Sequence, residues 1–300
     1  MKLIDCIPAQ SARLKTAGVS FGHGTTNAFD EAAWLILWTL GMPLDELEPH
    51  AKRELTAEEL TQIEAVVTER IETRRPAAYI TKEAWLQNVP FYVDERTIVP
   101  RSFIAELLAD GEGEGTLDTW LSDETHHVLD LCTGNGSLAV IAAMAYPEVE
   151  VDASDISDDA LAVARINVDK HKLAKRIRLM KSDLLADVGG PYDLIVCNPP
   201  YVNTQSMSAL PQEYRHEPAL ALAGGDDGMD LVRRILKDAP TRMSNIGVLV
   251  LEIGNERPHF EHVFRKLEVV WLDTSAGADQ VVLMTRDAML KWARYTPAKA

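Results

Sequence analysis

The spacing of apolar positions divides the chain into a helical first part and an alternating second part. In the first 75 residues the apolar positions recur with the period of amphipathic helices. Thr56 and Glu59 form a capping box, which predicts the start of a helix. Trp34 and Trp38 lie one helical turn apart, so we expect both to face the same hydrophobic core.

From residue 84 to residue 99 the pattern becomes extended and predicts a β-hairpin. Beyond it, apolar strands alternate with helical stretches, which is typical of βαβ units in a mostly parallel sheet. The last two strands are too close for a helical crossover, so we expect the final strand to be antiparallel. The prediction is an α/β fold with a helical domain at 1–84, a hairpin linker at 85–99 and an α/β domain at 100–300.

The composition is that of a globular protein. The chain has 300 residues, of which 46% are hydrophobic and 25% charged. No apolar run approaches the roughly 20 residues that span a bilayer, and the first residues do not read as a secretory signal, so we expect a cytoplasmic protein without membrane contact. Its three cysteines, Cys6, Cys132 and Cys197, lack metal-ligand spacing, so we expect reduced thiols and no metal site.

The charge is strongly negative and uneven. A net charge of −16 argues against direct sequence-specific binding to nucleic acid, which requires cations for the phosphates. Residues 102–164 contain no Lys or Arg. Two interpretations stay open for this acidic stretch: a solvated surface, or a face for a basic partner. Its acids are Glu106, Asp110, Glu112, Glu114, Asp118, Asp123, Glu124, Asp130, Glu148, Glu150, Asp152, Asp155, Asp158 and Asp159.

The segment Asn198-Pro199-Pro200-Tyr201, the NPPY motif, follows the apolar run 192–197. Open α/β sheets bind ligands where strands end, and the two prolines stiffen the backbone there. The carbonyls of Asn198 and Pro199 offer two acceptors for a planar NH2 group, and Tyr201 offers a ring for stacking. We therefore predict Asn198, Pro199, Pro200 and Tyr201 as substrate-binding residues. The alternative is a plain loop with two prolines.

The same residues have a catalytic interpretation. An amide nitrogen is a poor nucleophile, because its lone pair is shared with its carbonyl group. Acceptors that hold both N–H bonds favour a geometry in which that lone pair points at an electrophile, which is catalysis by positioning and electrostatics. Asn198, Pro199 and Tyr201 are the predicted catalytic residues.

A candidate cofactor site follows the strand at 128–132. Glycines let a ligand approach the backbone, and a helix amino terminus favours an anionic group. Asp155, after the second strand, can accept hydrogen bonds from two ribose hydroxyls. Asp130 can hold an ammonium group, or it can be a structural acid that binds the loop. The predicted loop residues are Thr133, Gly134, Asn135, Gly136 and Ser137.

This loop also satisfies the dinucleotide fingerprint, so a nicotinamide enzyme is a rival interpretation. Asp130 inside the first strand, the NPPY motif and the expected antiparallel strand weaken that rival. Asp183 and Leu184 follow the third strand and can contact an adenine ring. A helix-capping role for Asp183 is the alternative.

Taken together, these motifs resemble the Rossmann-like class I S-adenosylmethionine-dependent methyltransferases that act on planar nitrogens. The segments 74–80, 98–102, 198–202 and 210–218 resemble the protein N5-glutamine methyltransferases. Residues 100–108 and 213–218 are more similar to the branch that methylates large-subunit ribosomal protein three. The acid pair that the release-factor branch usually has after Pro-Arg-Pro is absent.

The resemblance implies S-adenosylmethionine as the cofactor and a basic ribosomal protein, free or in a ribosomal precursor, as the substrate. It implies contacts to cofactor or substrate from Thr133 to Ser137, Asp155 and Asn198. Asn135 departs from the small residue, Thr or Ser that is frequent in the family. Alternatives are a release-factor methyltransferase, an adenine-N6 methyltransferase of nucleic acid, and a ribosome assembly factor that binds the cofactor without catalysis.

Overall fold

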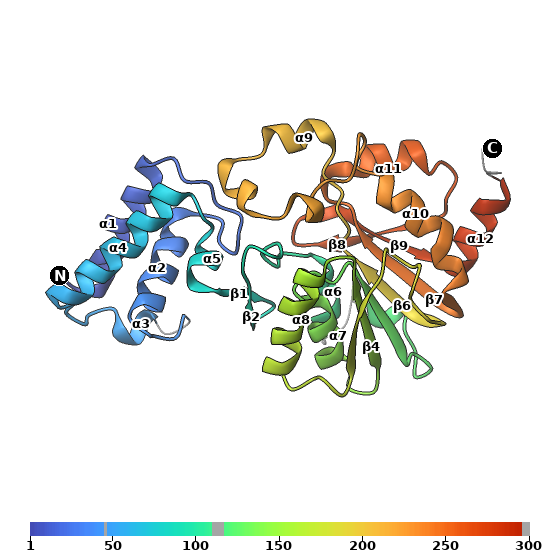
Figure 1. Cartoon of the computed structure of the whole chain (residues 1–300), viewed down its shortest axis with the longest axis horizontal. Helices are drawn as coiled ribbons and strands as arrows, with labels where there is room; N and C mark the ends of the chain where they lie inside the picture. Colours follow the sequence, from blue (N-terminus) through green and yellow to red (C-terminus); the bar gives the residue numbers. More distant parts are fainter. Residues whose placement is uncertain (45–46, 110–116, 296–300) are drawn as a thin grey trace.

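The computed structural model describes residues 1–44, 47–109 and 117–295. The acidic glycine-rich segment 111–115, with Glu112 and Glu114, and the neighbouring Asp110 lie outside the described residues. Figure 1 shows helices at the amino-terminal end of the molecule and a sheet flanked by helices at the other.

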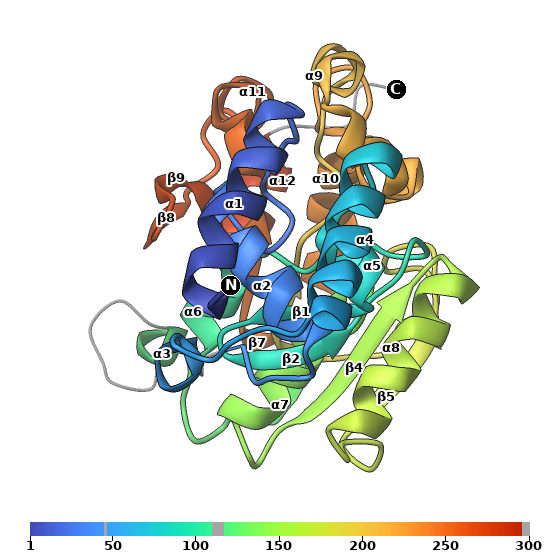
Figure 2. The ribbon, with the colours of Figure 1, turned by 90° about the vertical axis from the view of Figure 1, so that its left-hand side faces the viewer.

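The amino-terminal part is helical, as predicted. Thr56 and Glu59 form the predicted capping box, and the helix that they open ends at Thr73, because Arg74 adopts a left-handed conformation with φ 60°. Figure 2 shows α1, α2 and α4 packed side by side. These helices are α1 (Leu3–Thr16), α2 (Ala28–Thr39), α3 (Leu47–His50), α4 (Ala57–Thr73) and α5 (Ala77–Thr81).

The prediction that both tryptophans of α2 are buried is half wrong. Trp34 is buried, whereas Trp38 is 37% exposed. A step of four residues rotates a side chain by about 40° around the helix axis, and at the end of α2 this moves Trp38 out of the buried stripe.

The predicted hairpin is present and connects two hydrophobic clusters. It consists of β1 (Glu83–Leu86) and β2 (Val89–Tyr92), paired antiparallel. Ala84 packs with the amino-terminal helices, while Phe91 belongs to a core cluster of the sheet. The backbone of Tyr92 is also hydrogen-bonded to the buried side chain of Asn167. The hairpin therefore contacts both parts of the chain.

A seven-stranded sheet forms the second part, in the order β5-β4-β3-β6-β7-β9-β8. β9 pairs antiparallel with both β7 and β8, whereas the other neighbouring strands are parallel, so the predicted antiparallel final strand is confirmed. The strands are β3 (His127–Leu131), β4 (Glu150–Asp155), β5 (Ile177–Lys181), β6 (Tyr192–Cys197), β7 (Met243–Glu252), β8 (Val270–Thr274) and β9 (Gly277–Thr285).

Helices cover both faces of this sheet. Alternate strand residues point to opposite faces, so Val128 joins one core cluster and Leu129 the other. α6, α7 and α8 pack on the first face, and α10, α11 and α12 on the second. Their bounds are α6 (Ile104–Ala109), α7 (Ser137–Ala145), α8 (Asp158–Lys170), α10 (Asp230–Asp238), α11 (Arg257–Val263) and α12 (Arg286–Tyr295).

The remaining elements are short. Between β6 and α10 lie α9 (Thr204–Ala209) and the 3₁₀ turns η2 (Gln212–His216) and η3 (Ala219–Ala221). Three further 3₁₀ turns are η1 (Leu117–Thr119), η4 (Ala239–Thr241) and η5 (Gly254–Glu256).

Candidate active site

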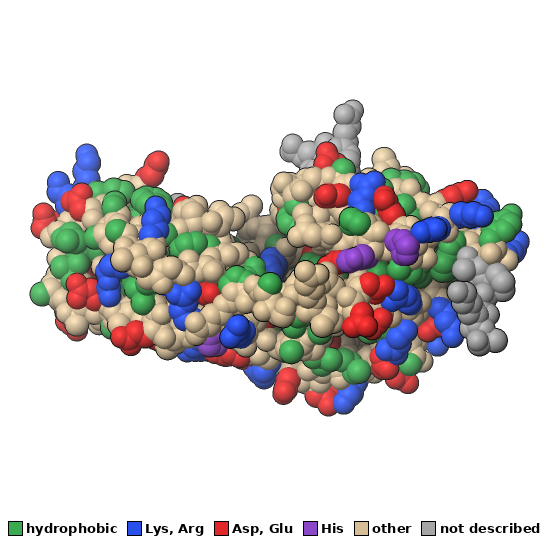
Figure 3. Space-filling model, turned by 90° about the horizontal axis from the view of Figure 1, so that it is seen from above, with side chains coloured by type: hydrophobic (Ala, Val, Ile, Leu, Met, Phe, Trp, Pro, Cys, Tyr) green, Lys and Arg blue, Asp and Glu red, His purple; other side chains and the backbone are tan. Residues whose placement is uncertain are grey.

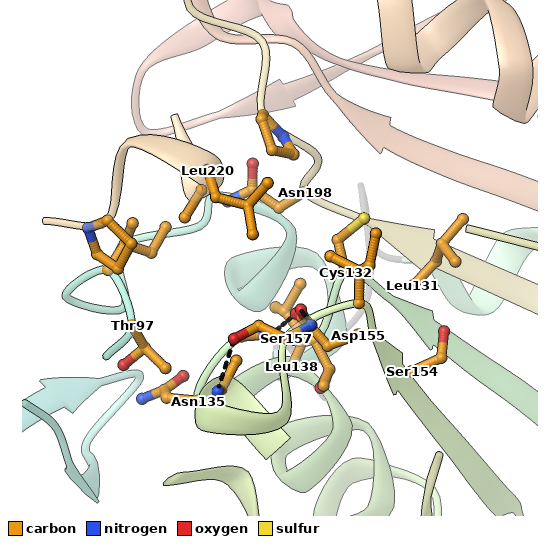
Figure 4. Close-up of a pocket in the computed structure, with 18 of the residues that line it drawn as sticks. Thr97, Leu131, Cys132, Asn135, Leu138, Ser154, Asp155, Ser157, Asn198 and Leu220 are labelled. Atoms are coloured by element: carbon orange, nitrogen blue, oxygen red, sulfur yellow. Dashed lines mark hydrogen bonds between the residues drawn. The ribbon is translucent and has the colours of Figure 1, made fainter. Parts of the chain in front are cut away.

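A cavity of about 290 Å³ lies at the carboxyl ends of β3, β4 and β6. The glycine-rich loop, the Asp155 turn and the NPPY motif line the same cavity, and Figure 4 shows Asn135, Asp155 and Asn198 around it. The predicted site residues that line it are Thr133, Gly134, Asn135, Ser137, Asp155, Asp183, Leu184, Asn198 and Pro200. Asp130, Gly136, Pro199 and Tyr201 are not among its lining residues.

Asp130 holds the glycine-rich loop. Its Oδ2 accepts a hydrogen bond from the Thr133 hydroxyl at 2.5 Å and another from the Ala139 backbone N–H at 3.0 Å. Complete burial raises the pKa of this carboxyl to about 7. These contacts support the loop-binding alternative for Asp130, and its role towards an ammonium group stays a prediction.

Asp155 connects two turns that line the cavity, the glycine-rich loop and the turn after β4. Its carboxylate accepts hydrogen bonds from the backbone N–H groups of Gly134 and Ser157, both at 2.9 Å. Burial raises the pKa of Asp155, while those two N–H groups act in the opposite direction. The side chain is therefore fixed in orientation while it still borders the cavity.

The two glycines of the loop have different tasks. Gly134 has φ +55° and borders the cavity, and a Cβ atom there would meet no atom within 4 Å. Gly136 has φ +81°, and a Cβ atom there would lie 3.1 Å from the Cβ of Ala164 in α8. Gly136 therefore allows the loop to pack closely against α8.

Asn135 is almost fully buried and is held by α8. Its carbonyl oxygen accepts a hydrogen bond from Asn167 at 2.8 Å, and its Oδ1 accepts one from the Ser137 N–H at 3.2 Å. Within the described ranges, its buried Nδ2 has no hydrogen-bond partner. This donor is available to a ligand in the cavity. Asn167 also binds the hairpin, so it connects the hairpin to the glycine-rich loop.

The predicted adenine contacts, Asp183 and Leu184, also border the cavity. Leu184 is buried and borders the cavity. Asp183 is 49% exposed and forms an ion pair with Arg234 at 2.7 Å. The residues that follow Asp183 form a turn rather than a helix, so the helix-capping alternative for Asp183 is wrong.

Asn198 is the polar group of the NPPY motif that borders the cavity. In the described part of the chain, its side-chain amide has no recorded hydrogen bond, and Figure 4 places it across the cavity from Asp155. The exposed Leu220 of η3 lies beside it. A polar group held at a strand end and left free to bind is what recognition of a ligand requires.

Tyr201 supports the motif from outside the cavity. Its hydroxyl donates to Glu252 at 3.2 Å, and its ring packs so closely on Gly254 that a Cβ atom there would lie 2.5 Å from Cε2. The buried Glu252 carboxylate also accepts from the Ser102 hydroxyl at 2.6 Å and the Phe103 N–H at 2.9 Å. Tyr201 therefore has a structural role, and because its ring does not line this cavity, its stacking and catalytic roles stay predictions.

A second buried carboxylate joins two segments that border the cavity. Glu217 accepts two hydrogen bonds from Arg101, at 2.6 and 2.8 Å, and one from the Val99 N–H at 2.9 Å. Burial would raise the pKa of Glu217, but the Arg101 guanidinium outweighs it and lowers this pKa to about 2. The linker and the segment after the NPPY motif, which both border the cavity, are thereby held together.

The sequence did not reveal three residues that hold the predicted site residues in place. They are Glu252, which contacts Tyr201, Asn167, which contacts Asn135, and Arg234, which contacts Asp183. Arg101 and Glu217 were noticed as parts of segments that resemble the glutamine methyltransferases, but their pairing was not predicted. The one available signal for Glu252 is an acid at the end of the apolar run 248–251. Such an acid usually has a buried partner.

The cavity fits S-adenosylmethionine in its chemistry. Asp155 can accept from ribose hydroxyls, Asn135 Nδ2 is a free donor, and aliphatic side chains can enclose a purine ring. The aliphatic lining residues are Leu131, Leu138, Ile156, Leu184 and Leu231.

The described residues contain neither a membrane-spanning helix nor a cluster of metal ligands. No helix in residues 1–44, 47–109 or 117–295 is long and apolar enough to cross a membrane. In these same ranges, His, Cys, Asp and Glu side chains form no cluster that could hold a metal ion.

The sheet order with its antiparallel β9, the glycine-rich loop and the NPPY motif define a Rossmann-like methyltransferase. Residues 113–214 match the methyltransferase small domain, and residues 11–81 match the PrmC N-terminal domain. A methyltransferase from Pyrococcus furiosus aligns at 16% identity and a TM-score of 0.47, over 65% of this chain and 88% of that one.

Two curated relatives narrow the class. The ribosomal protein uL3 glutamine methyltransferase of Bordetella pertussis is 51% identical over 96% of each chain. That of Neisseria meningitidis serogroup B is 49% identical, over 95% of this chain and 93% of its own. The chain belongs to the family of ribosomal protein uL3 glutamine methyltransferases.

Proposed function

We propose that this protein transfers a methyl group from S-adenosylmethionine to the side-chain amide nitrogen of a glutamine in ribosomal protein uL3. The observation that carries the proposal is the position of Asn198. Its side-chain amide borders the same cavity as Asp155 and the glycine-rich loop, and it is free to bind a ligand. The names of the relatives support a glutamine of uL3 as the target.

The protein's contribution is to bind and orient the reactants. Asp155 and the loop from Thr133 to Ser137 hold the cofactor, and Leu184 packs on its purine ring. When bound, S-adenosylmethionine supplies an electrophilic methyl group on a sulfonium. Asn198 accepts a hydrogen bond from the substrate amide, and the Pro199 carbonyl accepts the second one, so that the amide lone pair faces the methyl group.

The reaction gives N5-methylglutamine and S-adenosylhomocysteine. The nitrogen loses one proton, and it can do so after transfer, because an N-methylated amide cation is strongly acidic. Pro200 keeps the backbone stiff, and Tyr201 holds it through Glu252. This is catalysis by position and charge, with no covalent enzyme intermediate.

We further propose the division into a helical substrate-recognition domain at 1–84, a hairpin linker at 85–99 and a methyltransferase domain at 100–300. The substrate is a basic ribosomal protein, free or in a ribosomal precursor, and the protein acts in the cytoplasm where ribosomes assemble.

Mass spectrometry of cells with and without this chain tests the function. We expect one methyl group on one glutamine of uL3, present only when the chain is expressed and restored by re-expression. Methylation of a release factor instead would assign the chain to the other branch of glutamine methyltransferases. N6-methyladenine in nucleic acid would overturn the protein substrate, and an unchanged methylation pattern would favour a binding role without catalysis.

A further inference from the structure

The residues after the NPPY motif form a closed loop, residues 202–224, called here the bridging loop. Its two ends are hydrogen-bonded to each other, from Val202 N–H to the Leu222 carbonyl and from Gly224 N–H to the Val202 carbonyl, both at 2.9 Å. A Cβ atom on Gly224 would lie 2.7 Å from the Cα of Tyr201. The base of the bridging loop is therefore packed directly against the NPPY motif.

The far side of the bridging loop is anchored in the amino-terminal helices. Glu213 is fully buried and accepts a hydrogen bond from the Ser20 N–H at 3.0 Å. It also forms ion pairs with Arg74 at 2.8 Å and with Arg70 at 3.6 Å. Arg70 is itself buried and paired with Glu31 at 2.9 Å. The Glu213 carboxylate of the bridging loop is thus part of an ion-pair network in the helical part.

Further contacts lie around this anchor. The Tyr214 ring packs on His23 with centroids 4.2 Å apart, and His216 Nε2 lies 3.1 Å from the Thr73 carbonyl oxygen. In Figure 1 the segment with α9 lies above the junction between the helical part and the sheet, and Figure 3 shows the molecular surface hollowed at this junction. The bridging loop therefore connects the helical part to the active site.

This arrangement has a physical consequence for catalysis. A loop that is held at its base alone retains conformational freedom, and ordering it on binding costs free energy. Anchoring the far side removes part of that freedom in advance. Because positioning errors of about 1 Å can cost roughly 100-fold in rate, a loosened bridging loop should misplace Asn198.

We propose that Glu213 is a positioning residue, through which the amino-terminal helices hold the bridging loop and so fix Asn198 for methyl transfer. This inference rests on the proposed function. It differs from the simpler idea that the amino-terminal part provides a docking surface alone, because it predicts that the helices affect the chemical step after the substrate is bound.

The test compares Glu213→Gln with Arg53→Gln, using recombinant uL3 as the substrate. Arg53 lies in the same helical part, where it pairs with Glu59 at the surface and its backbone bonds to Leu3 and His50. We expect Glu213→Gln to lower the single-turnover rate at saturating uL3 by roughly 10–100-fold, with the S-adenosylmethionine Kd within about threefold of wild type. Arg53→Gln should match wild type in both.

A second readout does not depend on activity. Hydrogen exchange at the Val202 and Gly224 amides, which close the base of the bridging loop, should accelerate in Glu213→Gln and stay unchanged in Arg53→Gln. If Glu213→Gln folds poorly, Arg74→Lys serves instead, because it keeps a cation beside Glu213 but loses the guanidinium contacts to Ala17 and Gly18.

The outcomes separate the two proposals. A higher KM for uL3 with an unchanged saturating rate and unchanged exchange would overturn the positioning role and leave docking. If wild type does not methylate uL3, the proposed function fails, and the exchange measurement still decides whether Glu213 holds the bridging loop.

Discussion

The cofactor side and the amide side of the cavity are built in different ways. Around the glycine-rich loop, the bonds of Asp130 and Asp155 connect residues that are 2 to 21 positions apart. Around the NPPY motif, Glu252 bonds to Ser102 and Glu217 bonds to Arg101 across 150 and 116 positions. The carboxylates of the first region bond locally, and Asn167 adds a link from Asn135 to the hairpin, whereas the carboxylates of the second region are buried between distant segments.

Because of this difference, the two regions should respond differently to the loss of a distant bonding partner. Local bonds close small loops and form when β3 and β4 pair, so the two carboxylates of the cofactor side depend little on distant segments. The amide side requires the linker, β7 and the segment after β6 to be in place together. Disturbing a distant partner should therefore affect the amide side more than the cofactor side.

The largest expected effect comes from the amide side. Asn198→Ala should lower kcat by roughly 100-fold or more, because an acceptor for the substrate amide is lost in a site that works by positioning. The S-adenosylmethionine Kd should stay within about tenfold, since the cofactor-side bonds are local. Radiolabelled methyl transfer to uL3 and calorimetry measure the two quantities.

The exposed Asn255 provides the matched control for this variant, and Asn255→Ala should keep wild-type kcat. Near-wild-type turnover by Asn198→Ala would contradict both its assignment and the contrast between the two sides.

The second effect is confined to the cofactor side. Asp155→Ala should weaken S-adenosylmethionine binding by about 1.5–3 kcal/mol, because charge-assisted hydrogen bonds to the ribose are lost. The exposed Asp159 at the start of α8 is the control, and Asp159→Ala should bind normally. Calorimetry checks both variants. Preferential binding of NADH to wild type would overturn the methyltransferase cofactor itself.

The same contrast explains what the sequence could predict. The capping box of Thr56, the strands and the loop after β3 depend on neighbouring residues, and they were found. The contacts of Tyr201 with Glu252 and Gly254 span about fifty residues, so the sequence did not reveal them. Periodicity carries no information about which distant acid meets which arginine.

The third effect is on stability and depends on pH. Glu217→Gln should reduce the free energy of unfolding at pH 7 by about 2 kcal/mol, because Arg101 loses its buried counter-charge. The pKa of Glu217 is lowered from 4.5 to about 2, so its stabilisation is complete above pH 4.5 and is lost as pH falls towards 2.

Urea unfolding of wild type and Glu217→Gln measures this dependence. The difference between the two proteins should shrink by about 1 kcal/mol from pH 7 to pH 4. If this difference in the free energy of unfolding instead grew on acidification, it would have the wrong sign for a carboxylate with a lowered pKa. The ion pair between Glu217 and Arg101 would then not stabilise the amide side.

The smallest effect is expected from the acidic stretch. Its residues Asp118, Asp123 and Glu124 precede β3, whereas the cavity lies where β3 ends. β3 has five residues and is about 16 Å long, so the segment before it and the cavity at its other end are separated by more than the Debye length of roughly 8 Å at physiological ionic strength. Figure 3 also shows acidic and basic side chains interspersed on the face that it presents.

We therefore expect neutralisation of Asp118, Asp123 and Glu124 to leave the salt dependence of kcat/KM for uL3 nearly unchanged. Cofactor binding should respond even less, because Asp155 is partly buried and held by local bonds. The measurement is kcat/KM against ionic strength for both proteins. A flatter dependence in the variant would mean that the basic substrate is steered by these charges. Substrate binding would then depend on acidic residues well beyond the cavity. The amide side would thus rely on distant residues for the approach of the substrate as well as for its own structure.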